Sequence, residues 1–241
     1  MKISVIVPAF NEEKLIADSL GSVQASLVAF ARLGWETELI VCDNNSTDRT
    51  AELARAVGAT VVFEPVNQIG RARNRGAEAA TGDWLVFIDA DSYPSAGLFG
   101  EVAAAIQTGR CLAGGCLVRL EGWRFPTHLV VRLWNGISRL THWAAGSFIF
   151  CDASAFQRVG GFNRDLFVSE EIDLSKRLKK LARETGKEMV ILRRHPLMTS
   201  DRKLRLYSVP EILRFTAHLA FHPKRTLKNR AACHPWYDGR R

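Results

Sequence analysis

Four short apolar runs constrain the fold of this chain more than any other feature. They span residues 3–7, 38–42, 60–63 and 84–88, and stretches with apolar residues at helical spacing separate them, at 11–33, 48–57 and 68–80. Strands that alternate with helices pair in parallel, and the helices then cover both faces of the sheet. The pattern predicts an α/β fold, with a ligand crevice at the carboxyl ends of the strands.

The fourth apolar run ends on two carboxylates one residue apart, Asp89 and Asp91. Side chains at positions i and i+2 of a strand point to the same side, so these anionic groups repel each other unless a cation lies beside them. Mg²⁺ or Mn²⁺ prefers oxygen ligands and would also bridge to a phosphate. A plain turn is an equally open interpretation, since Asp, Ser and Pro94 are all turn formers.

Length and composition indicate one large α/β domain, with or without an appendage, because 241 residues with 47% hydrophobic content build a substantial core. No segment approaches the roughly 20 apolar residues of a spanning helix. Pro8 and Asn11 interrupt the first apolar run, whereas a signal peptide has a continuous apolar segment. We therefore expect a cytoplasmic protein. The five cysteines show no C-x-x-C spacing, which favours reduced, buried thiols over disulfides or a zinc site.

The positive charge of the chain is concentrated at its C-terminal end. Residues 193–241 hold twelve Lys or Arg against three Asp or Glu, which leaves about −1 for the rest of a chain whose net charge is +8. Such a segment suggests an anionic partner, or else a solvated basic face with no dedicated partner. An amphipathic helix expected around Ile212, Phe215 and Leu219 makes peripheral contact with the inner face of a membrane one option.

Beyond Pro94 the pattern is less regular. It predicts helices at 98–106, 125–140, 153–159 and 170–183, and strands at 111–120, 146–151 and 189–192. The pair Gly114-Gly115 indicates a break or bulge in the first of these strands.

Polar clusters follow the apolar runs or open the helices in a distinctive order. They are Pro8-Ala9-Phe10-Asn11-Glu12-Glu13, Asp43-Asn44-Asn45-Ser46-Thr47-Asp48, Gln68-Ile69-Gly70-Arg71-Ala72-Arg73-Asn74-Arg75-Gly76 and Asp89-Ala90-Asp91-Ser92, ahead of Gly160-Gly161-Phe162 and Ser169-Glu170-Glu171-Ile172-Asp173-Leu174. Over residues 3–192 the chain resembles the family 2 glycosyltransferases. The resemblance implies the GT-A fold, with a nucleotide-binding half at 1–92 and an acceptor-binding half at 93–192. A basic extension, 193–241, would then pack on or near the active site.

The resemblance also implies an activity: a sugar passes from a nucleoside diphosphate, UDP or GDP, to a hydroxyl acceptor with inversion at the anomeric carbon. The donor-binding residues it implies are Pro8, Ala9, Glu12, Asp43, Arg73, Asp89 and Arg194. Asp91 would hold Mg²⁺ or Mn²⁺, with Asp89 and His195 as further candidate ligands. His195 follows the last predicted strand, and a structural role for it stays open.

An inverting displacement needs a base that removes the proton of the acceptor hydroxyl. In the family this is the second acidic residue of a pair that opens a helix, which here is Glu171 after Glu170. Asp is commoner than Glu at that position, and Glu is one methylene longer. Glu170 therefore remains the alternative base.

Two rival functions are open to such a chain. A sugar-nucleotide-forming enzyme would need a glycine-rich basic loop after the first strand, whereas residues 8–13 are acidic and contain no glycine. A non-catalytic nucleotide-sugar-binding or membrane-docking module would lack the base or the metal pair. The basic C-terminal segment makes a lipid-linked acceptor a reasonable candidate, and we expect no nucleic-acid partner.

Overall fold

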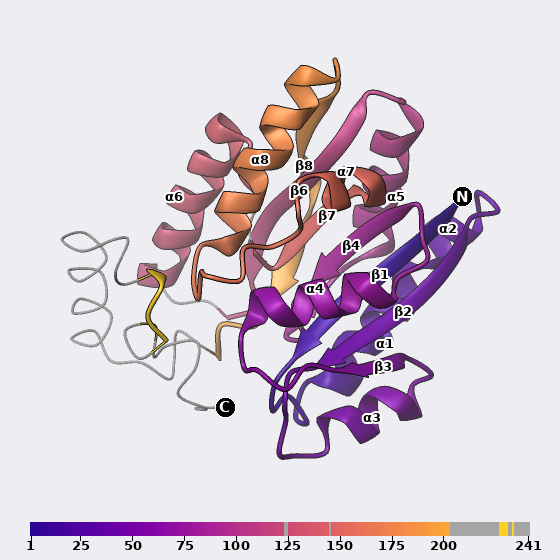
Figure 1. Ribbon diagram of the computed structural model, residues 1–241, viewed down its shortest axis with the longest axis vertical. Coiled ribbons are helices and arrows are strands. Elements are labelled where there is room, and N and C mark those ends of the chain that lie inside the picture. Colours follow the sequence, from indigo (N-terminus) through magenta and orange to yellow (C-terminus); the bar gives the residue numbers. More distant parts are fainter. Residues whose placement is uncertain (123–124, 145, 203–226, 231–232, 234–241) are drawn as a thin grey trace.

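The computed structural model describes residues 1–122, 125–144, 146–202, 227–230 and 233. An eight-stranded mixed sheet runs through this part of the chain, with helices on both faces (Figure 1). The strands are β1 (Lys2–Ala9), β2 (Glu36–Asp43), β3 (Thr60–Phe63), β4 (Trp84–Ile88), β5 (Ser92–Tyr93), β6 (Cys111–Leu120), β7 (Phe148–Asp152) and β8 (Glu188–Thr199). The helices are α1 (Ile16–Ser26), α2 (Val28–Ala31), α3 (Thr50–Ala56), α4 (Ile69–Ala79), α5 (Ala96–Gln107), α6 (Phe125–Thr141), α7 (Ala153–Arg158) and α8 (Glu170–Glu184).

The order of strands in the sheet is β3-β2-β1-β4-β7-β6-β8-β5. The first four are parallel, as the β-α alternation predicts. β7 then runs antiparallel to both β4 and β6, and β8 is parallel to β6. The sheet is therefore mixed, and the carboxyl ends of β1, β2 and β4 share one edge.

Several expected boundaries were wrong. β1 continues through Pro8, which pairs in register with Cys42, and the following helix begins at Ile16 instead of Asn11. β8 continues beyond residue 192 to Thr199, because its last residues pair with the end of β6 and with β5. Arg194 and His195 consequently lie inside a strand and not after it.

The glycine pair of β6 keeps regular pairing, and the irregularities flank it on both sides. A Cβ at Gly114 would meet the Phe150 ring, and one at Gly115 would meet Ala144. Close packing, and not a bulge at the pair itself, explains the two glycines.

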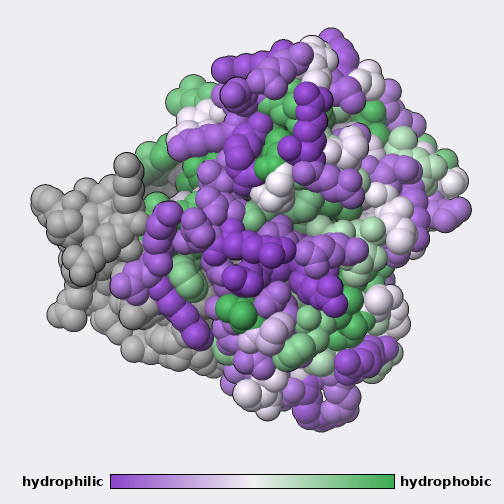
Figure 2. Space-filling model, viewed as in Figure 1, coloured by the Kyte–Doolittle hydropathy of each residue, from purple (hydrophilic) through white to green (hydrophobic). Residues whose placement is uncertain are grey.

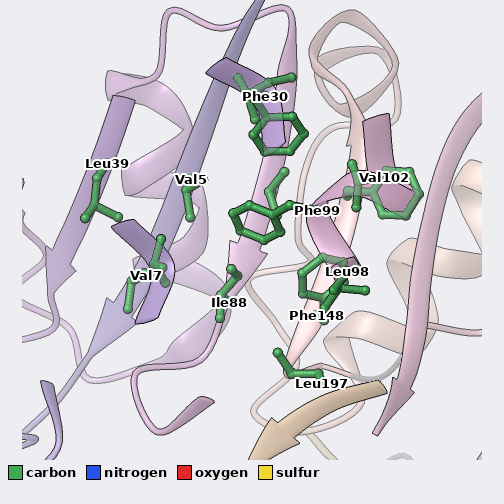
Figure 3. Packing of buried hydrophobic residues seen from close by; sticks show 14 of the residues in the cluster. Val5, Val7, Phe30, Leu39, Ile88, Leu98, Phe99, Val102, Phe148 and Leu197 are labelled. Atoms are coloured by element: carbon green, nitrogen blue, oxygen red, sulfur yellow. The ribbon is translucent and has the colours of Figure 1, made fainter. Parts of the chain in front are cut away.

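Hydrophobic side chains form one cluster on each face of the sheet. The larger one joins β1, β4 and β7 to α1, α2 and α5 (Figure 3). Within it the rings of Phe30 and Phe99 stack with centroids 5.1 Å apart. The second cluster packs α7 and α8 against the opposite face, around Phe87, Phe156 and Phe162. Burial of this apolar surface stabilises the sheet on both sides.

The predicted burial of the cysteines is confirmed for Cys42, Cys111, Cys116, Cys151 and Cys233. Within the described ranges, no helix combines the length and apolar character that crossing a membrane requires. The amphipathic helix expected around Ile212, Phe215 and Leu219 lies outside the described residues.

Candidate active site

The loops after β1 and β2 lie against each other at the carboxyl edge of the sheet. The backbone N–H of Asn11 donates to Ser46 Oγ at 3.0 Å, and that of Thr47 donates to Asn11 Oδ1 at 2.8 Å. Asp43, the last residue of β2, accepts a 3.0 Å bond at Oδ1 from the N–H of Ser46. Two of the predicted polar clusters, which contain Pro8, Ala9 and Asp43, therefore form one surface.

Asn44 organises this edge, although the sequence marked it only as part of a polar cluster. Its Oδ1 accepts from the N–H of Gln68 at 2.9 Å, and its Nδ2 donates to the carbonyls of Glu64 and Val66. Gln68 immediately precedes α4. Asn44 thereby positions the first turn of α4 against the end of β2.

Glu12 is buried in the same loop and is held by two residues that are far from it in the sequence. Its N–H donates to Thr50 Oγ1 at 2.7 Å, and its carboxylate oxygens accept from Arg202 Nη2 at 2.7 and 2.6 Å. The Nε and Nη1 atoms of Arg202 are buried and have no hydrogen-bond partner among the described residues. The role of Arg202 could not be predicted, because nothing in the sequence distinguishes it from the other basic residues after 193.

Arg73 lies at the centre of the candidate site, and only 1% of the residue is exposed. Its Nη2 donates to Asp89 Oδ1 at 2.8 Å and to the Gly146 carbonyl at 2.7 Å, and its Nη1 donates to Glu170 Oε1 at 2.8 Å. Its guanidinium carbon is 5.2 Å from the centroid of the Phe162 ring. Arg73 therefore connects the end of β4 to the start of α8, and its described polar contacts are with these groups.

A cavity of about 200 Å³ adjoins this cluster. It is lined by Ile69, Arg73, Asp89, Gly146, Ser147, Phe167, Val168, Ser169, Glu170 and Glu171. A larger cavity, of about 870 Å³, is lined by the later residues of α4 together with α7 and Asp173 and Arg177 of α8. The smaller cavity is the better candidate for chemistry, because the larger one includes none of the carboxylates around Arg73.

Three carboxylates share the single positive charge of Arg73. Burial, together with the neighbouring Glu171, raises the pKa of Glu170 to about 8 even though Arg73 opposes that rise. Burial also raises the pKa of Glu171. Burial disfavours the charged form of Arg73, but Asp89, Glu170 and Glu171 outweigh it and raise the pKa of the guanidinium. The excess negative charge favours binding of a proton or a cation.

The segment Asp89–Ser92 forms a turn, which is one of the two interpretations that the sequence left open, and the metal site stays a prediction. The N–H of Ser92 donates to the Asp89 carbonyl at 3.1 Å, which closes a turn, while the Asp89 side chain reaches Arg73. Asp91 is buried, and its carbonyl accepts from the N–H of Ser200 at 3.0 Å. Asp91 therefore lies next to the end of β8.

In the described part of the chain, no group of three or more His, Cys, Asp or Glu side chains is arranged to hold a metal ion. Mg²⁺ in phosphate-transfer sites is commonly bound by one or two carboxylates, with substrate phosphates and waters completing the shell. The oxygen donors of Asp89 and Asp91 fit that kind of site.

His195 contacts α5. Its Nδ1 lies 2.8 Å from Glu101 Oε1, and its backbone N–H donates to the same oxygen at 2.7 Å. A side chain at Gly97 would collide with the His195 ring, so the glycine makes room for it. The backbone N–H of Arg194 donates to Glu101 Oε2 at 3.4 Å, and the Arg194 side chain is exposed. The described contacts of His195 thus go to Glu101, and its metal role stays a prediction.

Comparison with known proteins shows the family and the fold of the chain. The sequence profile described as glycosyl transferase family 2 matches residues 4–165. The match covers well over half of the chain, so the chain belongs to this family. The crystal structure of TarS from S. aureus superimposes with a TM-score of 0.64 at 21% identity, covering 98% of this chain and 78% of that one. The crystal structure of glucosyl-3-phosphoglycerate synthase from Mycobacterium tuberculosis superimposes with a TM-score of 0.60 at 22% identity, covering 91% of this chain and 76% of that one. The GT-A fold is thereby confirmed.

Curated relatives match over shorter stretches. A Mycobacterium tuberculosis protein named as an uncharacterized glycosyltransferase is 36% identical over 124 residues, 52% of each chain. The dolichol-phosphate mannosyltransferase of Pyrococcus furiosus is 29% identical over 142 residues, 54% of this chain and 38% of that one. The chain therefore spans about half the length of the first of these relatives, and less of the second.

Proposed function

We propose that this protein is an inverting glycosyltransferase, which moves a sugar from a nucleoside diphosphate to a hydroxyl acceptor. The observation that carries the proposal is the cavity of about 200 Å³, which Glu171 lines together with Asp89 and Arg73. A carboxylate beside a cavity at the carboxyl edge of the sheet is placed to act on a hydroxyl group bound there.

Glu171 acts as the base in this mechanism. It takes the proton of the acceptor hydroxyl while the acceptor oxygen bonds to the anomeric carbon, and the bond from that carbon to the diphosphate oxygen breaks on the opposite face. A raised pKa makes Glu171 a stronger base than an ordinary carboxylate. Glu170 is the weaker candidate, because its Oε1 is already bonded to Arg73 at 2.8 Å. Glu170 and Arg73 position the base.

The donor lies along the edge formed by Pro8, Ala9, Glu12 and Asp43. Asp43 accepts a hydrogen bond from the nucleobase. The buried Nε and Nη1 atoms of Arg202 are placed beside Glu12, where they suit a ribose hydroxyl or a phosphate oxygen. Arg194 remains a further candidate for binding the diphosphate of the donor. Asp91 and Asp89 would hold Mg²⁺ or Mn²⁺, which neutralises charge on the leaving diphosphate when bound.

Related structures support UDP as the nucleotide part of the sugar donor. One structure of TarS from S. aureus is a complex with UDP-GlcNAc. One structure of the Mycobacterium tuberculosis synthase holds Mn²⁺, UDP and phosphoglyceric acid. We therefore favour UDP over GDP. A lipid-linked acceptor and contact with the inner membrane face are parts of the proposal supported by the basic end of the chain. A cytoplasmic location stays a prediction.

A screen of UDP- and GDP-sugars for nucleoside diphosphate release, with Mg²⁺ or Mn²⁺ and a panel of hydroxyl acceptors, tests the function. We expect release with at least one UDP-sugar, and loss of it in Asp91→Asn and Glu171→Gln. Glu188→Gln is the matched control, since Glu188 is an exposed acid at the far end of β8. If UDP-sugars bind and every donor and acceptor pair leaves them intact, the non-catalytic binding module becomes the better description.

A further inference from the structure

Helix α6 turns a polar side toward the protein. Asn135 Oδ1 accepts from the N–H of Val118 in β6 at 3.1 Å, and Asn135 Nδ2 donates to the Val118 carbonyl at 2.9 Å. Ser138 is fully buried, and its Oγ donates to the Trp143 carbonyl at 2.7 Å. Asn135 therefore attaches this helix to β6, and Ser138 bonds to the segment that follows the helix.

The outer side of α6 is apolar. Leu133, Ile137 and Leu140 are 66%, 36% and 83% exposed, and their spacing of four and then three residues places them on one face of the helix. We call these three residues the α6 stripe. A surface helix of a globular protein normally has the opposite polarity, with its apolar side toward the core. Figure 2 shows hydrophobic surface at this edge of the molecule, over the upper end of α6.

Basic side chains flank the α6 stripe. The sequence of α6 contains no acidic residue, and Arg132 and Arg139 are exposed and seven residues apart, so they lie along the same edge of the helix. An apolar stripe with cations beside it and no anions on the same helix is the pattern of helices that lie in a membrane interface.

The neighbouring helix α8 adds to this charge (Figure 1). Its Lys179 donates from Nζ to the carbonyl of Thr141, the last residue of α6, at 2.7 Å. Its Lys176 lies over the Trp143 ring, 4.8 Å from the centroid. Lys176, Lys180 and Arg183 are exposed at helical spacing. Exposed basic side chains therefore also lie on α8 beside the end of α6, where Lys180 pairs with Glu184 at 3.9 Å.

We propose that the α6 stripe docks on an anionic lipid surface. Its three aliphatic side chains enter the boundary between headgroups and acyl chains, while Arg132 and Arg139 contact lipid phosphates. A second copy of the chain is the poorer occupant, because a two-fold contact through this face would bring its arginines and lysines against those of the partner. No residue of α6 lines the catalytic cavity, so this surface is separate from that cavity.

Co-sedimentation of the full chain with vesicles tests the proposal. The vesicles are phosphatidylcholine alone, or phosphatidylcholine with a third of phosphatidylglycerol. We expect binding to the anionic vesicles and a fall in the partition coefficient of about tenfold or more in the double variant Leu133→Gln, Leu140→Gln. The double variant Arg132→Gln, Arg139→Gln binds anionic vesicles more weakly than the parent, and this difference shrinks at high salt, which screens the arginines of the parent.

The matched control is Phe63→Gln with Val66→Gln, which removes two exposed apolar side chains, 52% and 45% exposed, near the end of β3. Its partition coefficient stays that of the parent. The side chains replaced in all three double variants are exposed, so we expect each variant to fold. A melting temperature equal to that of the parent confirms it. Unchanged vesicle binding in the stripe variant overturns the proposal. So does a stripe variant that changes only the oligomeric state on size exclusion, which would assign this face to contact between copies.

Discussion

Arg202 bonds to both carboxylate oxygens of Glu12 through one nitrogen, across 190 residues of sequence. The contact joins the residues after β8 to the loop after β1, which the family resemblance assigns to the nucleoside. Because Glu12 is buried, the contact also neutralises a carboxylate that would be costly to leave alone.

Replacing Arg202 by Gln should weaken UDP binding about tenfold or more. The change removes a charge-assisted contact to Glu12 and two buried donor nitrogens, Nε and Nη1, with no described partner. Titration calorimetry with UDP and Mg²⁺ measures the effect. Arg110→Gln, at a side chain that is 76% exposed, is the control. Unaltered UDP affinity in Arg202→Gln would remove Arg202 from the donor site.

Replacing Arg73 by Met should lower the free energy of unfolding by about 3–5 kcal/mol, because the change leaves buried carboxylates without their cation. Urea denaturation measures it. Arg75→Met is the control on the same helix, since Arg75 is 49% exposed and pairs only with Glu78 among its described contacts. It should cost less than about 0.5 kcal/mol. Equal effects of the two changes would contradict the central role of Arg73.

Replacing Glu171 by Gln should lower kcat by a factor of about 10² to 10⁴, with the affinity for donor retained. Diphosphate release with a working acceptor measures the rate, and Glu170→Gln tells the two carboxylates apart. A larger loss of rate in Glu170→Gln, with donor binding intact, would reverse the assignment of base and positioning residue.

The pH dependence of kcat/KM should report the ionisation of Glu171. Glu171 must be ionised to accept a proton, so kcat/KM falls as pH drops through its pKa. Burial raises that pKa above the ordinary value of 4.5, and the acid limb of the profile should lie correspondingly above pH 4.5. Rate measurements from pH 4 to 9 locate the limb, after control assays exclude unfolding. A limb at or below 4.5 would be inconsistent with a buried base.

Two helical glycines should respond to Ala in opposite directions. A Cβ at Gly76 of α4 would collide with the side chain of Ile6 in β1, so Gly76→Ala should destabilise the fold by about 1–3 kcal/mol. Gly21 of α1 is exposed with open space around it, so Gly21→Ala should stabilise by up to about 1 kcal/mol. The melting temperatures of both variants, compared with that of the parent, measure the two changes in stability. A neutral Gly76→Ala would mean that α4 packs less closely on β1.

The amino-acid sequence by itself determined the alternation of the first four strands with helices, the polar edge at Asp43 and Asp89, and the family. These follow from local periodicity and short motifs, and the predicted bounds of β3, β4 and β6 agree with the structure. Only the tertiary structure revealed the burial of Arg73 among carboxylates, the pairing of Glu12 with Arg202, the contact of His195 with Glu101 and the outward side of α6. Each depends on which distant surfaces come together, and a local pattern carries no information about that.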